Sequence, residues 1–327
     1  RGTRDVPFPQ LTMRIGIVDP VHAILAEQLI RAGHEVLELH GRTAAEHSAE
    51  LDRCEGLVVR SSPIDAARID SSSGLRFVGR VGAGLENIDV AHCRDKGIKV
   101  LNSPEGNRDG VGESCVLLLL AMLKHVIPAD RAVHSGNWLR ETMRGTDLRG
   151  KTVGIIGFGQ MGSAFAEKLR GFGVRVLGHD KYRSGFSDST VLECDLDQVL
   201  RESDVISLHL PLTQETTYYA GADLFQRLQR PVWFLNTSRG GVVHTRALLD
   251  ALDAGQVIGA GLDVLEFERP ALDGIDPSTD PTTFDRLLRH ERVILTPHIA
   301  GVTHERKVKM AEVLAEKKKS QIPHATS

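Results

Sequence analysis

The sequence predicts an α/β protein with two parallel sheets, one in each of two lobes. Short apolar runs alternate with amphipathic stretches along most of the chain, which is the pattern of parallel strands covered by helices. A long apolar helix after about residue 108 interrupts this alternation once, and the pattern resumes at Lys151. A length of 327 residues is too great for one small core and suits two domains.

The first alternating series predicts five units of βα type, which is enough for a compact domain. We expect strands at Arg14–Val18, Glu35–Leu39, Gly56–Arg60, Arg76–Val81 and Lys99–Leu101. Helical stretches between them are expected near His22–Ala32, Ala44–Arg53 and Ile88–Lys96.

The second series predicts six strands, the number found in a doubly wound dinucleotide-binding sheet. They are expected at Lys151–Ile156, Val174–Leu177, Val205–Leu208, Pro231–Leu235, Val257–Leu262 and Val293–Leu295. The predicted fold class is therefore α/β with two Rossmann-like lobes.

Four further segments complete the expected organisation. A helix at Asp109–Leu123 is apolar around most of its circumference, so we expect it to be buried on several sides. The segment His134–Arg149 has weak periodicity and is interpreted as an excursion. Residues 271–286 are rich in Pro, Asp, Ser and Thr and predict a surface loop, and Thr303–Lys319 predicts a final helix.

The composition argues against several kinds of partner. A net charge of −3 gives no electrostatic case for nucleic acid. The longest apolar run is too short to span a bilayer, and residues 1–12 lack the apolar core of a signal peptide. Four cysteines without metal-type spacing favour a reduced cytoplasm and no metal site. Met13 is interpreted as a natural start, with residues 1–12 as a leader.

A glycine fingerprint predicts a dinucleotide site. The motif Gly157-Phe158-Gly159-Gln160-Met161-Gly162 follows a predicted strand and precedes a predicted helix, which is the context such a motif requires. The helix N-terminus would receive the phosphates. Asp180 ends the next strand at the distance expected of the ribose-binding acid, which favours NAD over NADP, although Lys181 and Arg183 nearby weaken that preference. The alternative is a glycine turn that binds no ligand.

Three chemically active side chains follow three later strands. Arg239 offers a guanidinium fork that matches a carboxylate, and His298 offers a base for a hydroxyl proton. Glu268 is placed to hydrogen-bond the far nitrogen of His298 and to favour the imidazolium. Taken singly, such an arginine is more often a surface charge and such a histidine structural. Their joint occurrence after a dinucleotide motif favours hydride and proton transfer from a 2-hydroxy acid.

These motifs, in this order and spacing, resemble the D-isomer-specific 2-hydroxyacid dehydrogenases from about Met13 to Lys319. The resemblance implies an Arg–Glu–His catalytic trio and Asp263 near the nicotinamide. Further cofactor contacts are implied at Thr237, Ser238, Arg239, Asp263, His298, Ala300 and Gly301, and on the adenosine side at His209, Leu210 and Pro211. It also implies a substrate domain of flavodoxin type, residues 13–108 plus 302–327, into which the NAD domain, residues 109–301, is inserted. A homodimer formed through the NAD domain and residues 109–149 is expected.

The first lobe is expected to choose the substrate. Gly82, Ala83 and Gly84 can present backbone N–H groups to a carboxylate. Arg60 and Arg80 offer two guanidinium groups for a phosphate, unless each merely pairs with a surface carboxylate. The predicted substrate contacts are Arg60, Ser61, Arg80, Val81, Gly82, Ala83, Gly84 and Asn107.

These residues resemble the phosphoglycerate dehydrogenase branch of the family most closely. The resemblance implies reversible oxidation of D-3-phosphoglycerate to 3-phosphohydroxypyruvate with NAD, the entry step to serine. The chain ends soon after its final helix, so we expect a short form without a C-terminal regulatory domain and without feedback by serine. A hydroxypyruvate or glyoxylate reductase of the same family stays open, as does a nucleotide-sensing binding protein similar to the corepressor of this fold.

Overall fold

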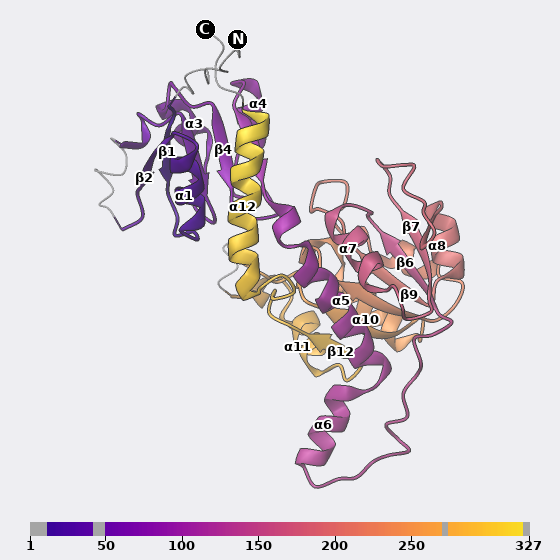
Figure 1. The fold of residues 1–327 in the computed structure, drawn as a ribbon. Helices are drawn as coiled ribbons and strands as arrows, with labels where there is room; N and C mark the ends of the chain where they lie inside the picture. Colours follow the sequence, from indigo (N-terminus) through magenta and orange to yellow (C-terminus); the bar gives the residue numbers. More distant parts are fainter. Residues whose placement is uncertain (1–11, 42–49, 270–273, 323–327) are drawn as a thin grey trace. The chain divides into compact units, whose positions relative to one another are not determined.

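The computed structural model divides the chain into two compact units, and it describes residues 12–41, 50–269 and 274–322 (Figure 1). The first unit consists of residues 1–107 and 303–327, and the second of residues 108–302. The predicted fold class is confirmed, because each unit is built on one parallel sheet.

The sheet of the first unit has five parallel strands in the order β2-β1-β3-β4-β5. This is the 2-1-3-4-5 order of flavodoxin-like folds. The strands are β1 (Arg14–Ile17), β2 (Glu35–Glu38), β3 (Gly56–Val59), β4 (Phe77–Arg80) and β5 (Lys99–Asn102). Each lies within two residues of a predicted strand, because near-continuous apolar runs are typical of strands buried on both faces.

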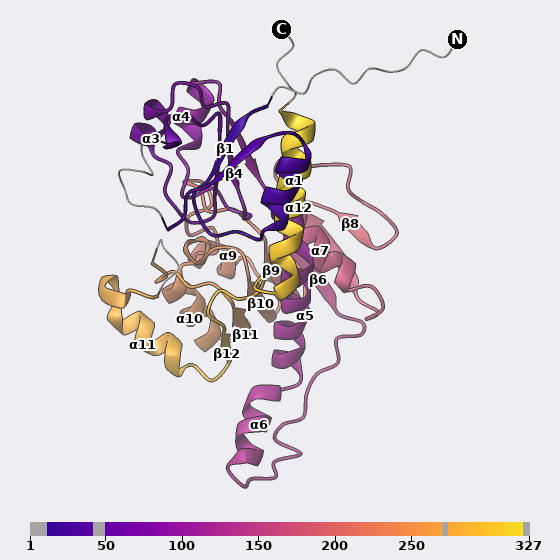
Figure 2. The same ribbon diagram turned by 60° about the vertical axis from the view of Figure 1, so that its left-hand side comes forward.

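Helices cover both faces of this sheet. On one face, α1 (Ile24–Arg31) and α12 (His304–Gln321) lie side by side and share a core with the sheet (Figure 2). On the other, α3 (Ala66–Ser71) and α4 (Val90–Asp95) each bury one residue in a second core. A 3₁₀ turn, η1 (Pro104–Gly106), leads out of the sheet. The last helix of the chain therefore completes the core of the first unit.

The sheet of the second unit has seven parallel strands in the order β12-β11-β10-β9-β6-β7-β8. Strand order reverses between β6 and β9, and such a switch point is where doubly wound folds bind ligands. The strands are β6 (Thr152–Ile156), β7 (Arg175–His179), β8 (Val191–Glu193), β9 (Val205–Leu208), β10 (Val232–Asn236), β11 (Val257–Leu262) and β12 (Val293–Leu295).

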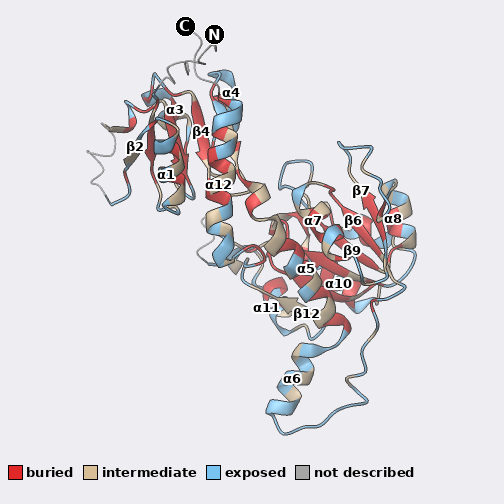
Figure 3. Ribbon diagram, viewed as in Figure 1, coloured by how far each residue is buried: buried red, intermediate tan, exposed pale blue. Residues whose placement is uncertain are grey.

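Two separate cores flank this sheet. One contains buried residues of α5 (Arg108–Leu123) and α7 (Gln160–Lys168). The other contains buried residues of α8 (Leu196–Glu202), α9 (Ala222–Gln226), α10 (Thr245–Asp253) and α11 (Pro281–Arg289). Figure 3 shows the strands buried between these helices, whereas α6 (Val126–His134) is largely exposed and has no buried residue.

The structure contains elements that the sequence did not predict. These are β8, α3, α6, α8, α9, α10, and α11 with the preceding turn η3 (Pro277–Thr279). The predicted loop at 271–286 is wrong in its second half, because Asp280 caps the N-terminus of α11 and Phe284 and Leu287 bury one face of that helix. Most of the helix expected at Ala44–Arg53 lies outside the described residues.

Among the described residues, no single helix is long and apolar enough to cross a bilayer. Only α5 and α6 together meet that criterion, and their axes are bent by 61° at the break between them.

Candidate active site and dinucleotide site

Three neighbouring strands deliver the predicted trio to one edge of the second sheet. Asn236 at the end of β10 pairs with Leu262 of β11, which pairs with Leu295 of β12. Because parallel strands end on the same side, the three following loops emerge together at the carboxyl edge, where α/β proteins bind ligands. Those loops carry the predicted arginine, glutamate and histidine.

His298 and Glu268 form a direct pair. Nδ1 of His298 lies 2.7 Å from Oε2 of Glu268, and Oε1 of Glu268 accepts the N–H of Leu265 at 2.6 Å. An ionised carboxylate only accepts hydrogen bonds, so Nδ1 carries the proton and Nε2 remains as the atom that can take another. Both side chains are partly buried, with 28% and 18% of their surface exposed. This is the arrangement of an oriented acid–base histidine.

Asp263 shapes the loop that carries His298. Its side chain accepts the hydroxyl of Thr296 at 2.6 Å and the N–H groups of Ile299 and Ala300 at 2.8 Å each, and its own carbonyl accepts the N–H of His298 at 2.7 Å. The residue is 1% exposed. His298 itself has a φ of 55°, an uncommon left-handed conformation for a residue with a side chain. The buried carboxylate thus holds the histidine in an unusual backbone geometry.

The Arg239 loop is fixed by the amide of Asn236, which the sequence analysis missed. Its Oδ1 accepts the N–H and hydroxyl of Ser238 at 3.0 and 2.7 Å, and its Nδ2 donates to the carbonyl of Arg239 at 2.9 Å. A Cβ on Gly240 would lie 1.9 Å from the carbonyl oxygen of Leu265, so only glycine permits this packing. The arginine loop therefore lies directly against the segment that leads to Glu268. An asparagine two residues before a serine, at a strand end, was the available signal.

The glycine motif has the geometry of a phosphate cradle. Gly157 has a φ of 91°, and a Cβ on Gly162 would lie 2.1 Å from the carbonyl oxygen of Gly157, so helix α7 approaches the strand closely. A Cβ on Gly159 would meet nothing within 4 Å, and Gly159 is the N-cap residue of α7, where no side chain caps the helix. Open space before unsatisfied helix N–H groups suits a pyrophosphate. The residues present therefore fit a dinucleotide.

The side chain of Asp180 accepts backbone N–H groups from the glycine loop and from the two residues at 182 and 183. Its Oδ2 accepts the N–H of Phe158 at 2.8 Å, and its Oδ1 accepts the N–H groups of Tyr182 and Arg183 at 2.9 and 3.0 Å. The guanidinium of Arg183 donates to the carbonyl of Phe158. The carboxylate thus stands at the end of β7, next to the glycine loop, as the sequence predicts for a ribose-binding acid.

The other predicted cofactor residues differ in what they can offer. Burial lowers the pKa of His209 to about 3, so its imidazole is neutral, while its carbonyl oxygen would lie 2.6 Å from a Cβ on Gly157. Thr237 and Ser238 are buried, as is Ala300, whose N–H is already bonded to Asp263. The remaining positions, placed beside the cradle or on the His298 loop, are Phe158, Gln160, Met161, Leu210, Pro211 and Gly301.

In the first unit, the guanidinium of Arg80 is hydrogen-bonded to backbone carbonyl groups. Its Nε donates to the carbonyl of Arg60 at 3.2 Å, and its Nη1 donates to the carbonyl of Gly84 and lies 3.5 Å from Oε2 of Glu86. The sequence predicts that Arg60 and Arg80 bind a phosphate together, and in the structure Arg80 also bonds the backbone of both neighbouring loops. Arg80 ties two neighbouring loops together.

Asp19 holds the loop after β3. A single oxygen, Oδ2, accepts the N–H groups of Arg60, Ser61 and Ser62 at 2.7, 2.8 and 2.9 Å, and Oδ1 accepts the hydroxyl of Ser62. Burial alone would raise the pKa of Asp19, but these hydrogen bonds lower it below its ordinary value. The backbone N–H of the predicted Ser61 contact is consequently occupied, and only its hydroxyl remains for a ligand.

The turn after β4 contains two backbone N–H groups that no acceptor among the described residues bonds. The N–H of Gly82 donates to the hydroxyl oxygen of Ser103 at 3.2 Å and to the carbonyl of Arg80, whereas no acceptor among the described residues takes the N–H of Ala83 or Gly84. Consecutive unsatisfied N–H groups of this kind bind anions. Val81 just before them is buried.

The side-chain oxygen of the predicted substrate residue Asn107 is buried. No hydrogen-bond donor within the described part of the chain bonds it.

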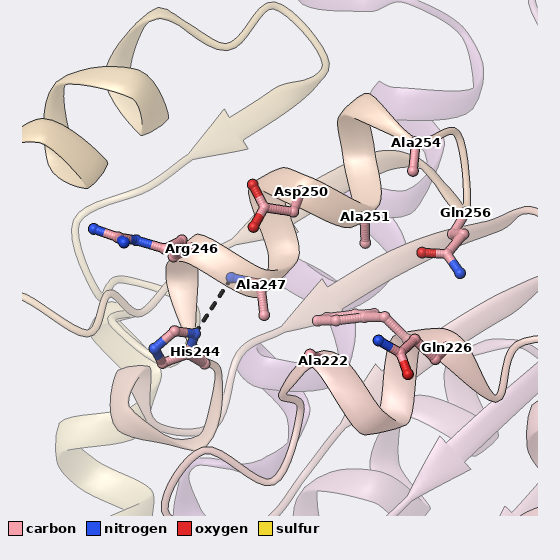
Figure 4. A pocket seen from close by; sticks show the side chains of 10 residues that line it. Ala222, Gln226, His244, Arg246, Ala247, Asp250, Ala251, Ala254 and Gln256 are labelled. Atoms are coloured by element: carbon pink, nitrogen blue, oxygen red, sulfur yellow. Dashed lines mark hydrogen bonds between the residues drawn. The ribbon is translucent and has the colours of Figure 1, made fainter.

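A separate hollow of about 360 Å³ lies between α9 and α10 (Figure 4). Apolar side chains such as Phe225, Ala247 and Ala251 line it, and none of the predicted site residues does. Within the described ranges, no group of three or more His, Cys, Asp or Glu residues could hold a metal ion.

Comparison with known proteins places the chain in a family. Residues 116–300 match the family model for the D-isomer specific 2-hydroxyacid dehydrogenase, NAD binding domain. The chain belongs to the D-isomer specific 2-hydroxyacid dehydrogenase family. The family is one of dehydrogenases of 2-hydroxy acids, and the matched domain is its NAD binding domain, as the sequence predicted.

Relatives of this chain carry different substrate names. It is 34% identical to D-3-phosphoglycerate dehydrogenase of Archaeoglobus fulgidus. The match covers 93% of this chain and 56% of that protein. It is 39% identical to glyoxylate reductase of Korarchaeum cryptofilum, over 83% of the chain and 81% of the relative. The crystal structure of a D-lactate dehydrogenase from Treponema pallidum superposes with a TM-score of 0.76 at 27% identity, covering 95% of this chain and 96% of that one. Similarity therefore gives the family but leaves the acid open.

Proposed function

We propose that this dehydrogenase interconverts D-3-phosphoglycerate and 3-phosphohydroxypyruvate with NAD. The observation that carries the proposal is the guanidinium of Arg60. It follows β3 at the carboxyl edge of the first sheet, its backbone is fixed by Asp19, and no carboxylate in the described part of the chain pairs with it. An unneutralised, exposed arginine at a ligand-binding edge suits a phosphate and is unnecessary for a small unphosphorylated acid.

The second unit would supply the chemistry. The guanidinium of Arg239 would hold the substrate carboxylate and polarise the reacting oxygen. Nε2 of His298 would take the C2 hydroxyl proton while the C2–H bond is broken, leaving a C2 carbonyl. Glu268, bonded to Nδ1, would orient the ring and stabilise the charge that it gains. The glycine cradle would hold NAD, which would supply the hydride acceptor.

The surroundings of Asp180 support NAD rather than NADP. Lys181 is paired with Glu215, and the guanidinium of Arg183 is bonded to the carbonyl of Phe158. The two cations that weakened the sequence argument are thus both engaged elsewhere. A free carboxylate lone pair would accept from a ribose hydroxyl and repel a 2′-phosphate.

The test is NADH oxidation with two keto acids that differ only by phosphate, 3-phosphohydroxypyruvate and hydroxypyruvate. The proposal predicts a kcat/KM at least about 100-fold higher for the phosphorylated acid, because two charged hydrogen bonds of about 1.5 kcal/mol each multiply to that ratio. Equal values for the two acids would overturn it. Arg60→Gln should remove most of the difference, whereas Arg68→Gln, a change of the same charge on the surface helix α3, should not.

A glyoxylate reductase is the second candidate. The engagement of Arg80 with backbone carbonyls removes one expected phosphate ligand, and the relative that shares 39% identity over 83% of the chain is named for glyoxylate. Under that alternative, glyoxylate would be reduced with the highest kcat/KM of the panel, and Arg60→Gln would change it little.

We further propose a homodimer formed through α6 and the segment that follows it. Val126, Val133 and Trp138 are 52, 54 and 77% exposed, although apolar side chains in one segment are usually buried. Val133→Asp should shift the protein toward monomer in light scattering after size exclusion. Leu288→Asp, at an equally exposed apolar position on α11, is the matched control. A wild-type protein that is monomeric at micromolar concentration would contradict the proposal.

A further inference from the structure

Helix α12 runs antiparallel to the strands of the first sheet, so that its N-terminus lies at their carboxyl edge. Near its end, the carbonyl of Gln321 is bonded to Lys99 at the start of β5. Nearer its start, a Cβ on Gly106 would lie 2.5 Å from the backbone nitrogen of Met310. The first turns of α12 therefore lie at the same edge as the Arg60 loop and the Gly82–Gly84 turn, all within the first unit.

Arg306, in the first turn of α12, brings a second guanidinium to this edge. Its backbone N–H is capped by the hydroxyl of Thr303 at 3.2 Å, and its side chain is half-buried. Burial first, and then the positive charge of Arg60, lower the pKa of Arg306 below its ordinary value. Arginine stays charged regardless. The antiparallel course of α12 thus places Arg306 at the sheet edge that also carries Arg60, and the two groups have the same charge.

The other donors at this edge are largely committed. Asp19 takes the N–H groups of residues 60–62, and Arg80 is bonded to backbone carbonyls. The two N–H groups of Ala83 and Gly84 suffice for one carboxylate-sized group. A second anionic group bound here would therefore have to be met by side chains, and Arg60 and Arg306 are the guanidinium groups that the fold brings together.

We propose that Arg306 is a specificity-determining residue, which with Arg60 forms a two-arginine clamp for the phosphate of the substrate. This proposal rests on the proposed function, since only a phosphorylated acid carries such a group. A bound dianion would relieve the repulsion between the two arginines and would accept bonds from both forks. An acid without phosphate would leave the repulsion in place and gain nothing from Arg306.

The test compares Arg306→Gln with wild type on 3-phosphohydroxypyruvate and hydroxypyruvate. We expect the ratio of the two kcat/KM values to fall about 10- to 100-fold, mainly through KM of the phosphorylated acid, which is the range for losing a hydrogen bond to a charged group. Arg306→Lys should restore part of the ratio, because it keeps the charge without the fork. Lys307→Gln, the same loss of charge at the next, exposed position, is the control. An unchanged ratio in Arg306→Gln, or an equal fall in the control, would overturn the clamp.

A second measurement separates failure of the clamp from failure of the proposed function. Inorganic phosphate should raise the Tm of wild type and of Lys307→Gln, and should raise that of Arg306→Gln much less, whichever keto acid is reduced. If wild type shows no preference for the phosphorylated acid but keeps this phosphate effect, the proposed substrate is wrong and the clamp binds another dianion. If phosphate raises the Tm of Arg306→Gln as much as that of wild type, the clamp itself is wrong.

Discussion

The two units hold their functional side chains by different means. In the second unit, His298 is bonded through its own ring to Glu268, and its loop is bonded to the buried Asp263. In the first unit, Asp19 and Arg80 bond mainly the backbone of the loops, with Ser62 and Glu86 as their side-chain contacts. The guanidinium of Arg60 extends from this fixed backbone without a carboxylate partner among the described residues. In the second unit, hydrogen bonds hold the reacting side chain itself. In the first unit, they hold the backbone that carries the side chains expected to select the substrate.

This difference has a physical reason. Proton transfer requires an atom held within a few tenths of an ångström, so the base must be locked by neighbours. Recognition of a phosphate requires charge and a donor fork, which tolerate some adjustment of a long side chain. A change at Arg60 or Arg306 should therefore alter which acid is used, and a change at His298 should alter how fast any acid reacts.

The largest expected effect lies in the second unit. His298→Ala should lower kcat by about 10²- to 10⁴-fold, the usual contribution of an acid–base group, and by the same factor for phosphorylated and unphosphorylated acids. NADH affinity, measured by fluorescence titration, should stay near that of wild type. His134→Ala, on the exposed helix α6, is the control. A loss confined to one substrate would break the division of roles between the units.

A second effect concerns the frame of the first unit, where Lys318 is only 3% exposed. Nδ1 of His34 accepts the N–H of Met13 at 3.3 Å, so Nε2 carries the proton and donates to Nζ of Lys318 at 2.5 Å. A ring N–H that faces Nζ disfavours the charged ammonium form of Lys318. Burial first, and then the charge of Arg76, lower the pKa of Lys318 from 10.5 to about 8.

The pH dependence follows from that lowered pKa. Between about pH 8 and pH 10.5 the unfolded chain binds more protons at Lys318 than the folded chain, so this residue makes the free energy of unfolding rise with pH. Below pH 8 the full cost remains, on the order of 3 kcal/mol for a shift of this size. Lys318→Met should remove the rise and increase stability at pH 7. Urea titrations at pH 7, 8.5 and 10 measure this, with Lys317→Met as the control at a more exposed position paired with Glu105. A variant that keeps the wild-type slope would show that Lys318 is charged in the folded state.

The smallest expected effect concerns the cofactor. Asp180→Asn should lower the ratio of kcat/KM for NADH to that for NADPH about tenfold, since one charged hydrogen bond to the ribose is lost and a repulsion is removed. Asp180 also bonds the glycine loop. Any loss of kcat/KM that a change in this loop causes for both cofactors cancels in the ratio. An unchanged ratio would assign Asp180 a purely structural role.

Much of the fold could be predicted because strands buried on both faces form apolar runs. β8 escaped prediction because three residues are too few to show a period, and α11 because Pro, Asp and Thr around it suggested a loop. Asp280 followed by Pro281 was in fact a start signal for a helix. α6 escaped because its apolar residues are exposed and give no buried stripe.

The site was predictable where spacing encodes chemistry, and not where the fold creates contacts. The pairing of His298 with Glu268 could be expected from their order after successive strands. The commitment of Arg80 could not, since it depends on carbonyls of residues 60 and 84 that only the folded sheet brings together. The placement of Arg306 at the same sheet edge as Arg60 likewise joins positions that are 246 residues apart in the chain.

Helix α12 sets the order in which the molecule can be completed. Met310, Ala311 and Leu314 belong to the same core as β1 and α1, yet they are made after every strand of the second unit. On the ribosome the N-terminal unit must therefore wait for residues 304–321, while the later unit already has all its strands. Translation that stops shortly after residue 302 would yield the complete sheet that carries the histidine, alongside an N-terminal sheet lacking the helix that covers one of its faces.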